Sequence, residues 1–148
     1  MKVAILMGSE KDMSKMEPSA AVLEEFGVEH EVHVMSAHRT PAKVAEFASS
    51  ARDNGFGAII CGAGKAAHLA GAVAAHSTLP VIGIPVSAGG LGGIDALYST
   101  VQMPTGIPVA TVAIDSSANA AYLAIAILSV GDEDLARKLD AYRTGLAE

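Results

Sequence analysis

The sequence predicts one α/β domain, residues 1–148, built on a five-stranded parallel sheet with helices on both faces. The main observation is that short apolar runs, typical of buried strands, alternate five times with segments of helical spacing. A length of 148 residues also suits one domain. In addition, no linker, internal repeat or low-complexity segment divides the chain.

The first half of the chain carries the clearest element boundaries. Residues 3–7 form an apolar run closed by Gly8-Ser9, which predicts a buried strand followed by a turn. Residues 12–26 have helical spacing, and Gly27 ends that helix. Residues 29–35 alternate and are rich in valine, which predicts the second strand.

The remaining elements follow the same alternation. Thr40 and Pro41 are typical of an N-cap and a first helical position, so a helix is expected from there to about residue 54. A glycine-rich loop occupies residues 88–93. The other strands are expected over residues 57–61, 80–86 and 108–114, and the other helices over residues 66–76, 94–102, 118–130 and 133–145.

Composition and charge argue against several classes of protein. The net charge is −6 and there is no basic run, so a nucleic-acid surface is not expected, although local donors can still bind one phosphate. Cys61 is the one cysteine, which rules out an intrachain disulfide and indicates a reducing compartment. The longest apolar stretch, residues 118–130, is too short to cross a bilayer, and no signal peptide is visible. We therefore expect a soluble, cytoplasmic protein with no membrane partner.

The composition also favours an oligomer. The chain is 51% hydrophobic but only 4% aromatic, so small residues dominate and large anchors are few. The helix expected over residues 118–130 is apolar nearly all round and needs cover on more than one side. In so small a domain, a second subunit is the natural cover.

The candidate site lies in the loops after the first three strands, because open parallel sheets bind ligands beyond the carboxyl ends of their strands. The first loop contains Gly8, Ser9 and Asp12. Glycine permits close approach, serine and the following amides can donate to a phosphate, and the aspartate can accept from ribose hydroxyls. The alternative is an ordinary helix N-cap with a tight turn.

The second loop, residues 36–41, places a histidine beside an arginine at a strand end. Arg39 offers the forked donors that suit a phosphate. His38 suits proton transfer, because imidazole exchanges protons near neutral pH. The alternative is a capped loop with a surface histidine.

The third loop, residues 62–71, is rich in glycine and alanine. It resembles the GxGxxG dinucleotide motif only loosely, because the third glycine and the later acidic residue are missing. Its small residues still permit a flat ligand to approach closely. Lys65 and His68 could contact that ligand, or they could be solvated residues at the start of a helix.

Other chemistry-bearing residues are weaker candidates. His30 and His33 lie on opposite faces of a strand and do not form a zinc motif. His76 is expected to be structural, and Cys61 a buried, inert thiol. The sequence has no recognisable metal cluster, Walker motif or Ser-His-Asp arrangement.

Together the loop motifs resemble those of one family. Met7-Gly8-Ser9 with Asp12 resembles the family's opening, SAHRTP at residues 36–41 matches its second motif in full, and GAG at 62–64 with AAHL at 66–69 matches most of its third. The matching positions further along are Leu91, Gly93, Asp95, Leu97, residues 101–104, Gly106, Pro108 and Val109. On these motifs the chain resembles the PurE family of purine biosynthesis, and within it the N5-carboxyaminoimidazole ribonucleotide mutases.

This resemblance implies a flavodoxin-like three-layer sandwich, an octamer of identical subunits, and a reaction without a cofactor, that is, without metal, ATP or biotin. The carboxylate would leave the exocyclic nitrogen of the substrate as carbon dioxide, which stays trapped until C4 of the aminoimidazole attacks it. The resemblance makes His38 the proton carrier and Arg39 the phosphate ligand, with Ser9 and Asp12 also binding substrate. The further substrate-binding positions are Gly8, Ser36, Ala37, Gly64, Lys65, Ala66, His68 and Leu69.

Two positions depart from the family pattern: Lys65 stands where glycine is usual, and Ala70 where proline is usual. A lysine facing the pocket would add a positive charge, but it could equally point to solvent. One alternative function is direct carboxylation of aminoimidazole ribonucleotide with carbon dioxide. That branch has lysine at the Arg39 position and lacks the Ala-Ala-His run. A non-catalytic flavodoxin-like binding module, or a carboxylase with Cys61 as nucleophile, completes the alternatives.

Overall fold

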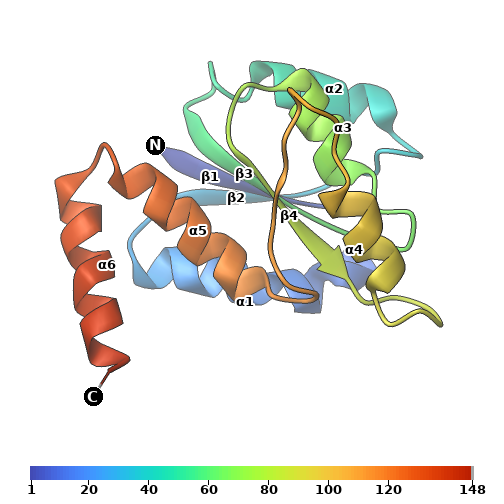
Figure 1. The fold of residues 1–148 in the computed structure, drawn as a ribbon. Helices are drawn as coiled ribbons and strands as arrows, with labels where there is room; N and C mark the ends of the chain where they lie inside the picture. Colours follow the sequence, from blue (N-terminus) through green and yellow to red (C-terminus); the bar gives the residue numbers. More distant parts are fainter. Residues whose placement is uncertain (148) are drawn as a thin grey trace.

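The computed structural model describes residues 1–147 and shows a three-layer α/β sandwich (Figure 1). All neighbouring strands are parallel, and their order across the sheet is β2-β1-β3-β4-β5. This is the flavodoxin-like order, so the predicted fold class is confirmed. The strands are β1 Lys2–Met7, β2 His30–Val34, β3 Phe56–Gly64, β4 Val81–Val86 and β5 Ala110–Thr111.

Helices cover both faces of this sheet. α1 and α5 lie on one face, and α2 and α3 on the other (Figure 1). α4 shares the second face, because Gly83 of β4 lies against both Thr100 of α4 and Ala70 of α3. The helices are η1 Glu10–Asp12 (a 3-10 turn), α1 Met13–Glu25, α2 Pro41–Ser50, α3 Leu69–His76, α4 Ile94–Val101, α5 Ser117–Ser129 and α6 Glu133–Gly145.

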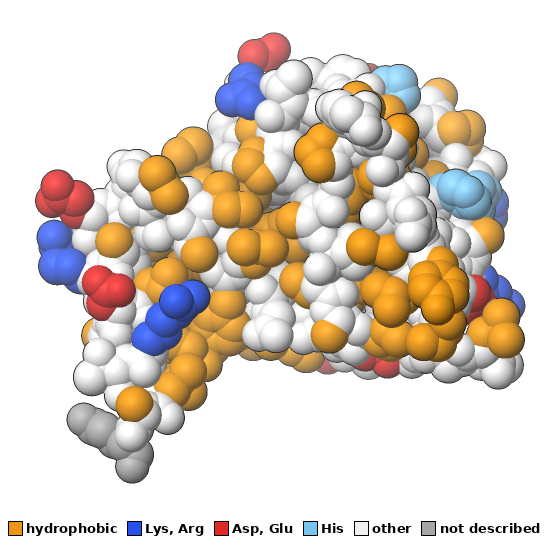
Figure 2. Space-filling model, in the orientation of Figure 1, with side chains coloured by type: hydrophobic (Ala, Val, Ile, Leu, Met, Phe, Trp, Pro, Cys, Tyr) orange, Lys and Arg blue, Asp and Glu red, His pale blue; other side chains and the backbone are white. Residues whose placement is uncertain are grey.

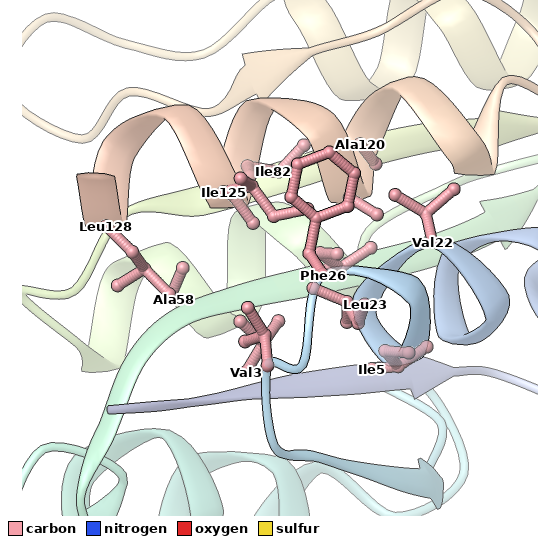
Figure 3. Close-up of a cluster of buried hydrophobic side chains, with 14 of the residues drawn as sticks. Val3, Ile5, Val22, Leu23, Phe26, Ala58, Ile82, Ala120, Ile125 and Leu128 are labelled. Carbon is pink, nitrogen blue, oxygen red and sulfur yellow. The ribbon is translucent and has the colours of Figure 1, made fainter. Parts of the chain in front are cut away.

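β1 lies inside the sheet, between β2 and β3, and its two faces contribute to two separate core clusters. Val3, Ile5 and Met7 are fully buried under α1 and α5, whereas Ala4 and Leu6 are fully buried under α2 and α3. Figure 3 shows the first of these clusters, where Phe26 and Leu23 of the α1 end meet Ile125 of α5. Because successive side chains of a strand point to opposite faces, a strand buried on both reads as a continuous apolar run.

The third strand is longer than its sequence predicts, and the helix after it starts later. β3 continues to Gly64, which pairs with Val86 of β4, and α3 begins only at Leu69. The side chain of Met16 fills the space beside Gly62, so a glycine suits this position of the strand. Lys65 then has φ +56°, so the chain turns where a helix was expected.

The fifth strand is much shorter than predicted. Only Ala110 and Thr111 pair with β4, although residues 108–114 were expected to be a strand. The chain still follows β4, since the amides of Val112 and Asp115 donate to the carbonyls of Gly83 and Pro85. These two isolated hydrogen bonds hold the segment beside β4 without forming a continuous ladder of strand hydrogen bonds.

The C-terminal helix α6 packs mainly on α5 and projects from the body of the domain (Figure 1). Tyr122 of α5 stacks on Tyr142 of α6 with ring centroids 4.7 Å apart. Despite the neighbours of α5, its Leu123 and Ile127 stay only half-buried, and the adjacent Val130 is 90% exposed. Within residues 1–147, no helix has both the length and the apolar character needed to cross a membrane.

Candidate active site

A cavity of about 520 Å³ opens at the carboxyl edge of the sheet, where the loops after β1, β2 and β3 meet. This edge contains the point at which the strand order reverses, between β1 and β3. The sequence-predicted site residues all line this one cavity: Gly8, Ser9, Asp12, Ser36, Ala37, His38, Arg39, Gly64, Lys65, Ala66, His68 and Leu69. Three segments that are far apart in the chain therefore form a single site.

The first loop supplies polar groups next to Gly8, where no neighbouring atom crowds the backbone. Ser9 is extended, and its Oγ accepts a hydrogen bond from the amide of Lys11 at 3.3 Å, so it also caps the 3-10 turn η1. The capping and binding interpretations of Ser9 are thus compatible. Nothing lies within 4 Å of where a Cβ of Gly8 would be, which leaves room for a ligand. Asp12 is half-buried, and this burial raises the pKa of its carboxyl.

The second loop is a self-bonded turn that aims His38 and Arg39 at the cavity. Ser36 Oγ accepts from the amide of Arg39 at 3.2 Å. Thr40 was expected to cap α2 with its side chain, but its hydroxyl instead bonds both the amide and the carbonyl of Ser36. The tight turn occupies this hydroxyl, so it is not available to the first amides of α2. Pro41 does begin the helix, as predicted.

Arg39 reaches from the second loop to the first. Its Nη2 donates to the carbonyl oxygen of Gly8 at 2.6 Å, which fixes the guanidinium between the two loops. Arg39 also lines a second hollow of about 480 Å³, which shares Gly8, Ser9, Lys11 and Ser36 with the main cavity. The guanidinium is therefore placed to serve a ligand that extends from one hollow into the other.

His38 and His68 form a hydrogen-bonded pair across the cavity. His38 Nε2 lies 2.8 Å from His68 Nδ1, which also lies 2.8 Å from the carbonyl oxygen of Ala66. A carbonyl can only accept, so the hydrogen bond to Ala66 requires the proton on His68 Nδ1. His38 Nε2 then faces that proton with its lone pair. The one N–H at His68 Nδ1 is then shared between the carbonyl of Ala66 and His38 Nε2, and this contact positions the His38 imidazole at the cavity.

Lys65 takes an uncommon backbone conformation at the cavity rim. Its φ of +56° lies in the left-handed region, which is a natural place for the glycine that the family usually has. Its Cε lies 3.3 Å from where a Cβ of Gly89 would be, so the side chain runs across the glycine-rich loop. Lys65 therefore lies at the boundary between the cavity and solvent.

Several residues of the site were missed in the sequence. Lys11, Ala63 and Ala88 also line the cavity. Ala88 begins the glycine-rich loop, whose composition was a signal that the fourth strand end also contributes. Cys61 is fully buried on the α2–α3 face, its pKa is raised by burial, and it does not line the cavity, so its expected inert character fits. Within residues 1–147, no three His, Cys, Asp or Glu side chains are close enough to hold a metal ion.

Fold and site together define a class: a flavodoxin-like α/β protein with a histidine pair and an arginine at the strand-order switch, suited to acid–base chemistry on a small anionic molecule. Within that class, the chain belongs to the AIR carboxylase family, whose family model matches residues 2–148. The family recognised from the loop motifs is thereby confirmed.

Individual relatives support this membership over nearly the whole chain. The chain is 54% identical over 138 residues to the N5-carboxyaminoimidazole ribonucleotide mutase of Aquifex aeolicus, covering 93% of this chain and 83% of that protein. It is 51% identical over 140 residues to the phosphoribosylaminoimidazole carboxylase of Saccharomyces cerevisiae, covering 95% of this chain but 24% of the yeast protein. The crystal structure of Treponema denticola PurE has a TM-score of 0.89 at 33% identity, covering 98% of this chain and 90% of that one.

Proposed function

We propose that this chain is an isomerase that converts N5-carboxyaminoimidazole ribonucleotide to 4-carboxyaminoimidazole ribonucleotide. The observation that carries the proposal is the cavity in which the His38–His68 pair and Arg39 come together. It holds a base for one proton and a cation for one phosphate. The Aquifex aeolicus relative, which carries the mutase name, supports this reaction at 54% identity.

The net reaction moves carbon dioxide from nitrogen to C4 and a proton from C4 to nitrogen. The N–C bond of the carbamate breaks and releases carbon dioxide, and C4 of the electron-rich ring then attacks it. C4 becomes tetrahedral and must lose its hydrogen before the ring is aromatic again. His38 is the base for this step: its Nε2 would exchange the contact with His68 for the C4 proton, and the same imidazole can return the proton to the nitrogen.

The substrate would span the two hollows that Arg39 lines. Arg39 and Ser9 line both hollows, so we place the phosphate against them. Asp12 lines only the main cavity and would accept hydrogen bonds from the ribose hydroxyls. The aminoimidazole then lies in the main cavity beside His38.

The walls around the reacting carbon are small and mostly apolar. Gly64, Ala66 and Ala88 line the cavity on the side of β3 and β4. They offer few groups that would hold water or compete with C4 for carbon dioxide, so the released molecule stays near the ring. The remaining substrate-binding positions, Gly8, Ser36, Ala37, Lys65, His68 and Leu69, would shape the rest of the pocket.

Direct carboxylation of aminoimidazole ribonucleotide is the second candidate. The yeast relative carries a carboxylase name, and Lys65 adds a cation at the rim that could attract bicarbonate or a carboxylate. The mutase is favoured because Arg39 and the Ala-Ala-His run at residues 66–68 are both present.

One assay with both substrates tests the two candidates. N5-carboxyaminoimidazole ribonucleotide should convert rapidly without ATP and with a chelator present, and label from free bicarbonate should largely stay out of the product in the first turnover. Aminoimidazole ribonucleotide should be carboxylated slowly at ordinary bicarbonate concentrations. Efficient carboxylation with rapid uptake of label would establish the carboxylase instead.

We further propose that the protein is a cytoplasmic homo-octamer. Four apolar side chains of α4 and the loop before it are between 47% and 67% exposed and form an apolar stripe (Figure 2): Leu91, Ile94, Tyr98 and Val101. Such a stripe is costly on a monomer and suits a contact with another copy. Light scattering should report a closed oligomer, and a monomer at micromolar concentration would contradict this part of the proposal.

A further inference from the structure

Lys15, Ser87 and Asp115 form a hydrogen-bonded cluster beside the candidate site, which we call the Lys15 anchor. Lys15 Nζ lies 2.5 Å from both the carbonyl oxygen and the Oγ of Ser87, and 3.1 Å from Asp115 Oδ2. The Ser87 amide donates to Asp115 Oδ1 at 2.8 Å, and its hydroxyl donates to the other carboxylate oxygen. An ammonium has three N–H groups, so these contacts engage all of its donors.

The Lys15 anchor joins three elements that are distant in the chain: α1, the end of β4 and the segment before α5. Lys15 and Asp115 are each about one-third exposed, so part of their hydration has been replaced by these contacts. Asp115 also has φ +56°, a conformation that residues other than glycine rarely adopt. Strain of this kind persists only where surrounding contacts hold it, and it is frequent next to functional sites.

Two walls of the candidate site are attached directly to the Lys15 anchor. Ala88 follows Ser87 and lines the cavity, and Asp12 lines it one helical turn before Lys15. Glycines at residues 89, 90, 92 and 93 follow, three of them at positive φ, and such a segment cannot by itself hold Ala88 in place. Ser87 is therefore the last firmly bonded residue before the loop.

The Lys15 anchor also acts on Asp12 through charge. Burial raises the pKa of the Asp12 carboxyl, the nearby Lys15 ammonium lowers it, and the Asp115 carboxylate raises it to a smaller extent. Lys15 thus favours the ionised form that would accept hydrogen bonds from a ribose. The other charged or titratable groups that line the same cavity are Lys11, His38, Arg39, Lys65 and His68.

We propose that Lys15 is a positioning residue of the site: bound to Ser87 and Asp115, it holds the Ala88 wall in place and supplies the counter-charge of the Asp12 carboxylate. It does not line the cavity and its N–H groups are engaged, so it acts through its neighbours and not on the substrate. The effect on substrate rests on the proposed function of Asp12, whereas the effect on the Asp12 carboxyl does not.

The test compares Lys15→Met with Lys15→Arg, and uses Lys43→Met on the exposed face of α2 as the matched control. Lys15→Met should raise KM for N5-carboxyaminoimidazole ribonucleotide about tenfold, with kcat within about twofold, because ribose binding and the cavity wall are disturbed while His38 is not. Lys15→Arg keeps the charge and the donors, so KM should stay within about threefold of the wild type. Lys43→Met should match the wild type.

An NMR titration of the Asp12 carboxyl carbon in the ligand-free protein gives a readout that needs no activity. The pKa of Asp12 should rise further in Lys15→Met and remain near the wild-type value in Lys15→Arg. If Lys15→Met does not fold, Lys15→Gln keeps donors without charge and should show the same rise. An unchanged titration with unchanged KM would overturn the proposal, even if the melting temperature falls. A shifted titration in a protein without mutase activity would refute the proposed function and retain the role of Lys15.

Discussion

Gly64 offers a sharp test of how tightly the site is packed. A Cβ at this position would lie 2.9 Å from Ala88 Cβ and 3.0 Å from the carbonyl oxygen of Val86. Both contacts are shorter than real Cβ atoms normally make, and neither neighbour is a flexible side-chain end. Gly64 also pairs with Val86 in the β3–β4 ladder, so the strands cannot separate without losing hydrogen bonds.

Gly64→Ala should therefore lower the free energy of unfolding by about 1–3 kcal/mol, the usual cost of one extra carbon in a packed site. For a chain of this length, that corresponds to a fall in melting temperature of about 3–10 °C at fixed protein concentration. Scanning calorimetry measures this directly. Gly90→Ala is the matched control, because nothing lies within 4 Å of its added carbon and its φ is not positive.

The same substitution should also impair the retention of carbon dioxide, because the added methyl pushes Ala88 outward from the wall. Label from free bicarbonate should then enter the product during mutase turnover, which the wild type and Gly90→Ala should largely prevent. A melting temperature within about 1 °C of wild type, together with unchanged label exclusion, would refute the packing argument for this wall.

Three further predictions address the charged and titratable groups. His38→Asn should keep substrate affinity and lower kcat at least about a hundredfold, and near-normal turnover would show that another group moves the proton. Arg39→Ala should weaken substrate binding by about 2 kcal/mol, measured by calorimetric titration, while dephosphorylated substrate binds both forms equally; unchanged affinity would place the phosphate elsewhere. Burial raises the pKa of Asp115, but hydrogen bonds from Ser87 and Lys15 outweigh it and hold that pKa below the ordinary value of 3.8. The stability that ionised Asp115 contributes is thus present above its unfolded pKa and lost as pH falls through its folded pKa. Asp115→Asn should therefore be less stable than wild type at neutral pH, and denaturant titrations should show the difference shrinking below about pH 4. A constant difference down to pH 2 would mean that the carboxylate charge is irrelevant.

The apolar runs were enough to predict the sheet and most helices. β1 and β4 are buried on both faces, so their composition leaves no competing interpretation. β5 was predicted too long because residues 108–114 are apolar enough for a strand, yet pairing at an edge depends on how the chain returns to β4. The late start of α3 depends on the left-handed turn at Lys65, where a lysine gives no local signal for such a turn.

The location of the candidate site could be predicted from the loop positions and the motifs, but the tertiary contacts within it could not. The rule that open parallel sheets bind ligands beyond the carboxyl ends of their strands placed the first three loops at one edge, which is where the cavity lies. The pairing of His38 with His68 joins residues 30 positions apart, and no spacing rule predicts it. Asp115 is 100 residues from Lys15 in the chain, so the sequence could not predict the Lys15 anchor. Thr40 shows the opposite error, where a strong local capping signal was overridden by a bond to Ser36.

The glycine-rich loop has a consequence for how activity would depend on protein concentration. Ala88 at its start lines the cavity, and Leu91, three residues later, begins the exposed apolar stripe that continues along α4. A neighbouring copy that covers Leu91 would restrict the motion of the loop and so help to hold Ala88 in place. Specific activity per subunit is then expected to fall on dilution below the assembly threshold, before any loss of secondary structure.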